Sequence, residues 1–235
     1  MIRHRAIQKE DKQERHEAIL EAAERLLARS PERVASVAEV ADEAGLAKGT
    51  VYLYFPSKEE LLLALHERNI DGFFRAVITL LESDVTVGID EVLDLTRQHI
   101  MQPALFLPLA ARCFGLMAHS VPIDVATAFK LRMAERLQSA GAGIERRFPQ
   151  LAPGNGVALF RRSYALILGL WQMSASSGES DASCASAKGV APSPVFAWRY
   201  ADELDHALRA LWHGTLGTPA SAPLRQHRGA RSEVK

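Results

Sequence analysis

Residues 44–61 read AGLAKGTVYLYFPSKEEL, and this stretch decides how the first quarter of the chain folds. Gly45 can take the positive φ that a tight turn between two helices needs. Pro56 closes the segment that follows, because proline has no N–H to donate to a helix. The stretch therefore predicts a short helix over residues 48–54, which the chain enters through a turn at Gly45.

Two sequence signatures of helix starts flank the turn. Ser36 to Glu39 reads S-x-x-E, and Ser57 to Glu60 repeats the pattern. In such a capping box the serine hydroxyl accepts a free backbone N–H, and the glutamate reaches back to the cap. The first box predicts a short helix that ends at Gly45, and the second predicts a long helix. Two short helices joined by a tight turn form a helix-turn-helix.

Apolar residues elsewhere recur at spacings of three and four, which predicts an all-α protein. Pro103 and Pro122 suit first helical positions, and Pro108 is expected to kink the helix that contains it. The helices expected outside the motif cover about residues 11–29, 89–101, 103–120, 122–148, 155–175 and 194–213.

The pattern divides the chain into two domains. We expect a helix-turn-helix domain over residues 1–62 and a larger helical domain over residues 63–213. Residues 175–193 are rich in Ser, Ala, Gly and Pro, which predicts a flexible loop. Residues 214–235 lack a core pattern, and we expect them to be disordered.

The composition is that of a globular protein. The 235 residues are 48% hydrophobic and 24% charged, with a formal net charge of zero. No apolar run reaches the about 18 residues of a membrane span, and the charged N-terminus has no signal-peptide pattern. Two cysteines do not make a disulfide scaffold. We therefore expect a soluble cytoplasmic protein that is not bound to a membrane, without a metal site or cofactor.

The helix over residues 48–54 carries side chains that suit a nucleic acid. Lys48 can reach a guanine edge or a phosphate, and Thr50 can bind a base or touch a thymine methyl. Tyrosine hydroxyls donate to phosphate oxygens. Lys58 lies in the first turn of the next helix, where free backbone amides also favour a phosphate. The predicted DNA contacts are Lys48, Gly49, Thr50, Tyr52, Leu53, Tyr54 and Lys58.

The charge of the N-terminal region leaves alternatives open. Residues 1–60 contain ten Lys and Arg against twelve Asp and Glu. Arg3, Arg5 and Lys9 form a basic arm that either follows the DNA or is a solvated tail. The helix-turn-helix could also serve only for packing, but packing alone does not require the exposed Lys-Thr-Tyr-Tyr set.

The run from Ser36 to Leu61 resembles the DNA-binding domain of the TetR/AcrR family of transcriptional regulators. The pieces AGLAKGTVYLYF and PSKEEL match the family's turn, recognition helix and following helix start. Ala47 stands where the family often has a serine or threonine, and Val37 where it often has a threonine. The resemblance implies a dimer that binds an inverted repeat in double-stranded DNA.

The larger domain concentrates aromatic and flexible side chains on a few helix faces. Such stripes are typical of a core, but members of the family hold a small molecule among these helices. The resemblance therefore implies a site for an apolar or amphipathic effector. The predicted ligand-binding residues are Phe73, Phe106, Cys113, Met117, Phe129 and Met133.

Two helices of the larger domain, residues 155–175 and 194–213, are strongly apolar. The first is apolar on two sides, which indicates burial on two sides. The resemblance implies that both pack against their copies in a homodimer. The alternative is a core formed within one chain.

Three classes of function compete. The first is a repressor that a small molecule releases from DNA, and the second is a dimeric DNA-binding protein without an effector. The third is an enzyme, but the sequence has no metal-ligand spacing, G-x-S-x-G or glycine-rich phosphate loop. Cys113 could pair with His99 or His119 as a nucleophile, although its apolar helix face indicates a packing residue. We expect a regulator, not an enzyme.

Overall fold

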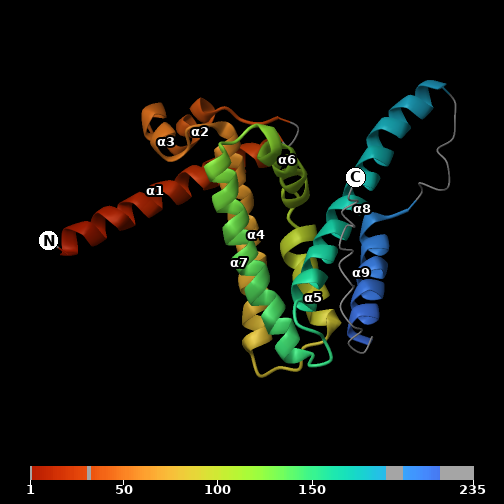
Figure 1. The fold of residues 1–235 in the computed structure, drawn as a ribbon. Helices are drawn as coiled ribbons and strands as arrows, with labels where there is room; N and C mark the ends of the chain where they lie inside the picture. The colour runs from red at the N-terminus through yellow and green to blue at the C-terminus, as the bar shows by residue number, and fades with distance from the viewer. Residues whose placement is uncertain (1, 31–32, 189–197, 218–235) are drawn as a thin grey trace, which may run out of the picture.

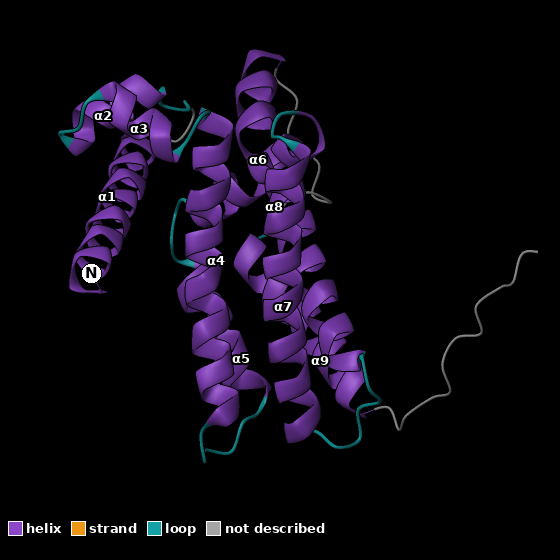
Figure 2. Ribbon diagram, turned by 60° about the vertical axis from the view of Figure 1, so that its left-hand side comes forward, coloured by secondary structure: helices purple, strands orange, loops and turns teal. Residues whose placement is uncertain are grey.

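The computed structural model describes residues 2–30, 33–188 and 198–217, and every regular element in these ranges is a helix, which confirms the all-α fold (Figure 2). The elements are α1 (Ile2–Arg29), α2 (Val37–Ala44), α3 (Lys48–Tyr54), α4 (Lys58–Glu82), α5 (Ile89–Thr96), a π-helical turn η1 (Arg97–Met101), α6 (Phe106–His119), α7 (Ile123–Arg147), α8 (Asn155–Lys188) and α9 (Tyr200–Gly217).

The long helix α4 connects the two parts of the molecule. α2 and α3 lie together at the end where α4 begins, and α1 projects away from the larger bundle (Figure 1). α7 runs alongside α4, and α8 and α9 pack together on the opposite side of the bundle. The N-terminal helices therefore touch the rest of the chain mainly through α4.

Two groups of buried apolar side chains hold the fold. The larger group contains side chains from all the helices between α4 and α9, and its fully buried members include Leu159 and Leu204. The second group, which we call the N-terminal cluster, fills the space between α1, α2, α3 and the first half of α4. It also contains three residues from the larger bundle, which are Leu109 and Cys113 of α6 and Phe129 of α7.

The N-terminal arm differs from expectation, because α1 already begins at Ile2. Residues 2–30 contain neither proline nor glycine and are rich in Ala, Leu, Glu, Gln, Lys and Arg, all of which favour a helix. Nothing in this stretch stops the helix, so the residues expected to form a flexible basic arm continue α1 instead.

The segment around the prolines also differs. α6 begins at Phe106 rather than at Pro103, whose carbonyl accepts the Phe106 N–H at 3.0 Å. Pro108 thus lies in the first turn of α6, where backbone N–H groups have no partner within the helix. Its missing N–H removes no helical hydrogen bond there, so the expected mid-helix kink does not occur. Pro122 precedes the first residue of α7.

The expected loop and tail are shorter than predicted. α8 continues to Lys188, so residues 175–188 are helical, and α9 continues to Gly217, so residues 214–217 are helical too. Alanines are frequent between residues 175 and 188, and no proline occurs before Pro192 to end the helix. The remaining residues of the predicted loop and tail, 189–193 and 218–235, lie outside the described residues.

No single helix in the described ranges is long and apolar enough to cross a membrane. One bent pair, Ile89–Met101 with Phe106–Met117, meets the criterion of length and composition only when both parts are taken together. The two parts meet at an angle of 79°, and much of their apolar surface is buried in the core.

Candidate functional site

The turn between α2 and α3 has the geometry that its sequence predicts. The Ser36 hydroxyl accepts the Glu39 N–H at 3.3 Å, and Glu39 accepts the Ser36 N–H at 2.8 Å, which completes the capping box. Gly45 has a φ of 66°, and its N–H donates to the Asp42 carbonyl at 3.2 Å. Only glycine takes this backbone conformation at little cost, and the turn therefore depends on it.

One face of α3 is buried and the other is open to solvent. Val51 is fully buried in the N-terminal cluster, whereas Leu53 is 85% exposed and Tyr52 43% exposed. A side chain added at Gly49 would meet no atom within 4 Å, so the backbone there is open to a close approach. Lys48 Nζ lies 5.8 Å from the centre of the Tyr52 ring, which keeps both side chains on the exposed face.

Two of the predicted DNA contacts are also part of the packing. Thr50 and Tyr54 are half-buried. The Tyr54 ring lies 6.4 Å from the His16 ring of α1, and Phe55 lies 5.0 Å from it. Tyr54 thus helps to hold α3 against α1, and the exposed residues of α3 remain on the side that faces solvent.

Lys58 begins α4 beside this face. Ser57 caps the helix by accepting the Glu60 N–H at 3.1 Å. Lys58 is exposed, and its Nζ lies 3.9 Å from a Glu59 carboxylate oxygen. The predicted contacts are therefore gathered on α3 and on the first residue of α4, where the positive end of the helix favours an anion.

Several acidic side chains of the N-terminal domain are paired with arginines. Arg25 donates to Glu43 at 2.9 Å, and Arg29 also pairs with this carboxylate. Hydrogen bonds from Arg25 and Arg29 lower the pKa of Glu43. Arg33 pairs with Glu39 in the same manner at 2.6 Å. Arginines therefore neutralise Glu39 and Glu43 of α2, and α3 itself carries no acidic residue.

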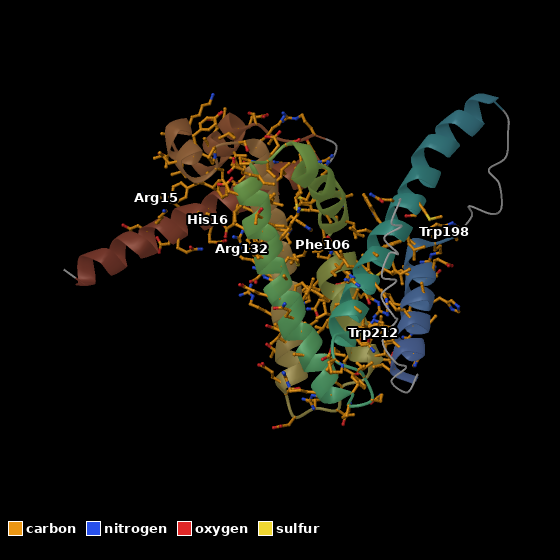
Figure 3. All side chains as sticks on the ribbon, in the orientation of Figure 1. Arg15, His16, Phe106, Arg132, Trp198 and Trp212 are labelled. Carbon is orange, nitrogen blue, oxygen red and sulfur yellow. The ribbon has the colours of Figure 1, made fainter. Side chains whose placement is uncertain are left out.

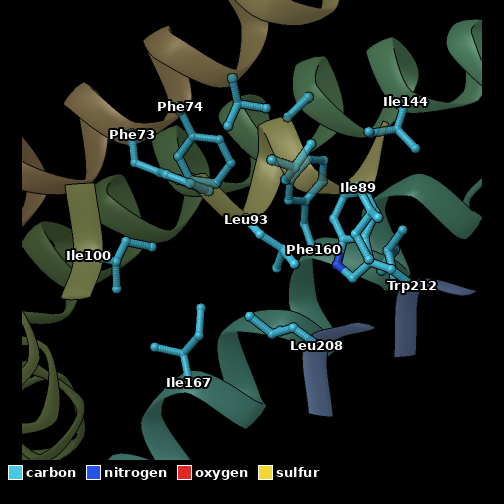
Figure 4. Packing of buried hydrophobic residues seen from close by; sticks show 14 of the residues in the cluster. Phe73, Phe74, Ile89, Leu93, Ile100, Ile144, Phe160, Ile167, Leu208 and Trp212 are labelled. Carbon is cyan, nitrogen blue, oxygen red and sulfur yellow. The ribbon is translucent and has the colours of Figure 1, made fainter. Parts of the chain in front are cut away.

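A cavity of about 360 Å³ lies in the larger bundle, between α4 and the helices that surround it. Apolar side chains from α4, α5, α8 and α9 converge on this region (Figure 4). Phe106 of α6 and Trp212 of α9, both labelled in Figure 3, also line it. All six residues predicted to bind a ligand line this one cavity, namely Phe73, Phe106, Cys113, Met117, Phe129 and Met133.

The cavity also has polar lining residues that the sequence reasoning missed. Thr96 Oγ1 donates to the Val92 carbonyl at 2.9 Å. Ser163 Oγ donates to the Leu159 carbonyl at 2.9 Å and accepts the Trp212 Nε1–H at 3.0 Å. These hydroxyls are therefore engaged within the protein. The lining polar residues are His66, Thr96, Lys130, Arg161, Ser163 and Tyr164.

His66 of α4 is the most buried polar residue of the lining, with 2% of its surface exposed. Its Nε2 lies 3.3 Å from the Tyr164 hydroxyl, and its ring is 5.6 Å from the Phe106 ring. Burial lowers the pKa of His66 to about 4. The spacing Leu62–His66–Ile70 places it on the apolar face of α4, which is the signal that could have identified it.

The other ionisable candidates do not form a reactive site. Burial raises the pKa of the Cys113 thiol to about 12, so the thiolate needed for nucleophilic attack is strongly disfavoured. His99 is half-buried and does not line the cavity, and the side chain of His119 is outside the described set. Within the described ranges no three His, Cys, Asp or Glu side chains are grouped to hold a metal.

The walls of the cavity are joined directly to the N-terminal domain. Cys113 Sγ lies 3.7 Å from the Leu62 carbonyl of α4, and Cys113 and Phe129 belong to both the lining and the N-terminal cluster. Arg132 of α7 makes two hydrogen bonds to Glu67 of α4, at 2.6 and 2.7 Å. α6 and α7 therefore contact α4 next to the helix-turn-helix.

Two family descriptions match this chain along most of its length. Residues 19–65 match the bacterial regulatory proteins of the tetR family, and residues 67–219 match the tetracyclin repressor-like C-terminal domain. The chain therefore belongs to the TetR family. Because this is a family of transcriptional regulators rather than enzymes, the enzyme alternative is set aside.

Individual relatives resemble mainly the N-terminal domain. The chain is 43% identical over 70 residues to the HTH-type transcriptional regulator EthR of Mycobacterium tuberculosis, which is 30% of this chain and 32% of that protein. It is 32% identical over 74 residues to the fatty acid metabolism regulator protein of Bacillus subtilis, which is 32% of this chain and 36% of that protein. The chain thus spans about a third of the length of these two relatives.

Solved structures show the same fold over most of the chain. A TetR-family transcriptional regulator from Streptomyces coelicolor superposes with a TM-score of 0.51 at 19% identity, over 86% of this chain and 99% of that one. SmeT, the repressor of the Stenotrophomonas maltophilia multidrug efflux pump SmeDEF, superposes with a TM-score of 0.51 at 18% identity, over 89% of this chain and 96% of that one.

The lowered pKa of His66 predicts a loss of stability in acid. The ordinary pKa is 6.5 and the folded-state value is about 4, so between these values the unfolded chain binds the proton more readily. Above pH 6.5 His66 is neutral in both the folded and the unfolded chain and does not lower the free energy of unfolding. As the pH falls from 6.5 to about 4, protonation of the unfolded chain lowers this free energy by about 3 kcal/mol. Urea unfolding at fixed protein concentration should show this loss, and His66→Leu should reduce it. Equal losses in the two proteins would contradict the assignment.

Proposed function

We propose that this protein is a homodimeric transcriptional repressor, which binds an inverted-repeat DNA operator and is released by a small, mainly apolar effector. The observation that carries the proposal is that Cys113 and Phe129 line the cavity and also pack in the N-terminal cluster. An occupant that moves these side chains must change the packing that holds the helix-turn-helix. Repression requires only that the bound dimer cover its DNA site.

The DNA-binding part of the proposal rests on the exposed face of α3 and the start of α4. Lys48, Tyr52 and Leu53 are all exposed on α3, and Lys58 stands at the positive end of α4. We assign Lys48 and Thr50 to base edges and Lys58 to a phosphate. Tyr52 and Tyr54 are assigned to the backbone, and the open backbone at Gly49 lets α3 lie close to the major groove.

Removing the charge of Lys58 tests the phosphate contact. Lys58→Ala should weaken binding to all DNA sequences alike and reduce the slope of log affinity against log salt by about one. Arg75→Ala is the matched control, because Arg75 is exposed on the far half of the same helix and pairs with Asp71 at 3.0 Å. Fluorescence anisotropy with an operator selected from random DNA gives both slopes. An unchanged slope in Lys58→Ala would remove this residue from the interface.

The dimer part of the proposal concerns the outer faces of α8 and α9. Leu204 is fully buried within the chain, because it packs in the larger core, and so it does not face a second copy. The opposite side of α9 carries the exposed Ala210, and α8 carries the exposed Ala165 and the half-buried Gly169. Small side chains allow helices of two copies to approach closely, which supports a four-helix contact there.

A charge on this face should separate the dimer. Ala210→Arg should turn a dimer into a monomer at micromolar concentration, because a bulky charged group would be buried between the copies. Ala142→Arg is the matched control, on an exposed position of α7 outside the proposed contact. Sedimentation velocity measures both. A monomeric native protein would refute the dimer, and a dimeric Ala210→Arg protein would place the contact on another face.

Release by an effector requires coupling between cavity and DNA. A hundredfold change in DNA affinity corresponds to about 2.7 kcal/mol, within the usual range of such couplings. A ligand supplies this energy only as a difference in its affinity for the two states. The cavity volume of about 360 Å³ and its apolar lining favour a small apolar molecule.

Filling the cavity tests the effector. Met117→Trp adds bulk to the lining, and it should reduce the potency of every releasing compound by at least about tenfold, since the compounds must then compete with the indole for space. Met101→Trp is the control, because Met101 is half-buried but does not line this cavity. DNA binding is titrated against a library of apolar compounds. Equal potency in both variants would move the site elsewhere, and no release by any compound would favour a dimeric DNA-binding protein without an effector.

A further inference from the structure

We propose that His66 recognises a polar group of the effector, and that the effector is therefore an uncharged, mainly apolar molecule with one hydrogen-bonding oxygen. This inference rests on the proposed function, because it names the class of molecule that the cavity takes. It adds a specific contact to a cavity whose buried hydroxyls, those of Thr96 and Ser163, are already bonded within the protein.

The first observation is a buried polar atom without a partner. His66 Nδ1 is fully covered by protein and has no hydrogen-bond partner among the residues that the structure describes. Buried polar atoms in native proteins are nearly always paired, and an exception points to a missing partner. Because His66 lines the cavity while its Nδ1 is covered, an occupant that shifts the covering side chains can supply that partner.

The second observation is that the ring is held in place. Nε2 lies 3.3 Å from the Tyr164 hydroxyl, and the ring packs between Phe106 at 5.6 Å and Phe129 at 6.4 Å. A neutral imidazole has one donor and one acceptor nitrogen, and the Tyr164 contact occupies Nε2, so Nδ1 is the nitrogen left for a ligand. Tyr164 is thus a positioning residue. A ligand hydroxyl can donate or accept, and it satisfies Nδ1 with either tautomer.

The third observation concerns what the rest of the lining offers. The hydroxyls of Thr96 and Ser163 are already bonded inside the protein. Placing an ionised group beside a neutral, buried imidazole is costly, because the charge loses its water without gaining a counter-ion. Lys130 and Arg161 also line the cavity but are exposed, and they would be the contacts of an anionic ligand. The buried end of the cavity therefore favours a neutral polar group.

The position of His66 links this contact to DNA. His66 lies eight residues after Lys58 on α4, which is about 12 Å along the helix axis. A ligand oxygen bonded to Nδ1 therefore acts on the same rigid element that carries the proposed phosphate contact. Its neighbour Glu67 binds Arg132 of α7 at 2.6 Å, so a displacement of α4 at this point would also strain the contact with α7.

Three probes of nearly equal shape test the proposal, namely naphthalene, 2-naphthol and 2-naphthoate. Calorimetric titration of the full chain, without DNA, should show 2-naphthol binding about tenfold more tightly than naphthalene, since one good hydrogen bond is worth about this factor. The anionic 2-naphthoate should bind most weakly. His66→Leu should abolish the preference for 2-naphthol over naphthalene, and Tyr164→Phe should reduce it.

Thr96→Val is the matched control, because it removes a lining hydroxyl that is already satisfied, and it should keep the native preference. The same preference in His66→Leu as in the native protein would overturn the proposal. Tightest binding by 2-naphthoate, with its loss in Lys130→Ala or Arg161→Ala, would overturn it in favour of an anionic ligand. Failure of all three probes to bind would overturn it as well.

A second measurement keeps the test independent of the folding of His66→Leu. The nitrogen-15 NMR signal of His66 Nδ1 in the native protein should shift with 2-naphthol but not with naphthalene, and no shift with bound 2-naphthol would count against the contact. Failure of the proposed function is distinguishable, because it appears as no release of DNA by any compound, while the preference among the probes is measured without DNA.

Discussion

The burial of one face of α4 against α6 and α7 is the contact on which the rest of the structure depends. Without it, the helix-turn-helix would be joined to the larger bundle only by an exposed helix. Leu62 of α4 contacts Cys113, and Phe129 reaches the same group of side chains from α7. Because protein interiors are closely packed, these few side chains transmit displacement rather than absorb it. The two domains therefore share a core at this point.

Ion pairs on the outside of this contact set the register of α4 and α7. Burial opposes ionisation of Glu67, but hydrogen bonds from Arg132 and Arg136 outweigh it and lower its pKa. Arg136 also bonds Asp71, one turn further along α4, at 3.0 Å. Partly exposed pairs of this kind contribute little to stability. The bidentate contact of Arg132 with Glu67, and the bridge that Arg136 forms between Glu67 and Asp71, instead favour one alignment of the two helices over others.

Local sequence signals predicted the fold well where the interactions themselves are local. The capping box at Ser36 and the turn at Gly45 involve residues a few positions apart, and both have the expected geometry. The apolar stripes, taken together with the resemblance to the family, also indicated side chains that line the cavity. The spacing Leu62–His66–Ile70 marks His66 as part of the apolar face of α4, but it does not reveal the contacts with Phe106 and Tyr164, which are distant in the chain. Leu204 shows the same limit, since an apolar stripe does not say whether its partner belongs to the same chain.

The shared core also constrains how the molecule could switch. Cys113 and Phe129 cannot fill the N-terminal cluster in one arrangement and make room for a larger occupant in the same one. An occupant that fits the present volume without displacing them leaves the packing of the cluster as it is, and one that binds both arrangements equally shifts nothing. Recognition through His66 changes this balance, because the ring moves with α4 and its Nδ1 meets a ligand oxygen at one position of that helix only. A hydrogen bond is more sensitive to distance and angle than apolar contact. The polar group of an effector, more than its apolar body, would therefore decide which position of α4 is favoured.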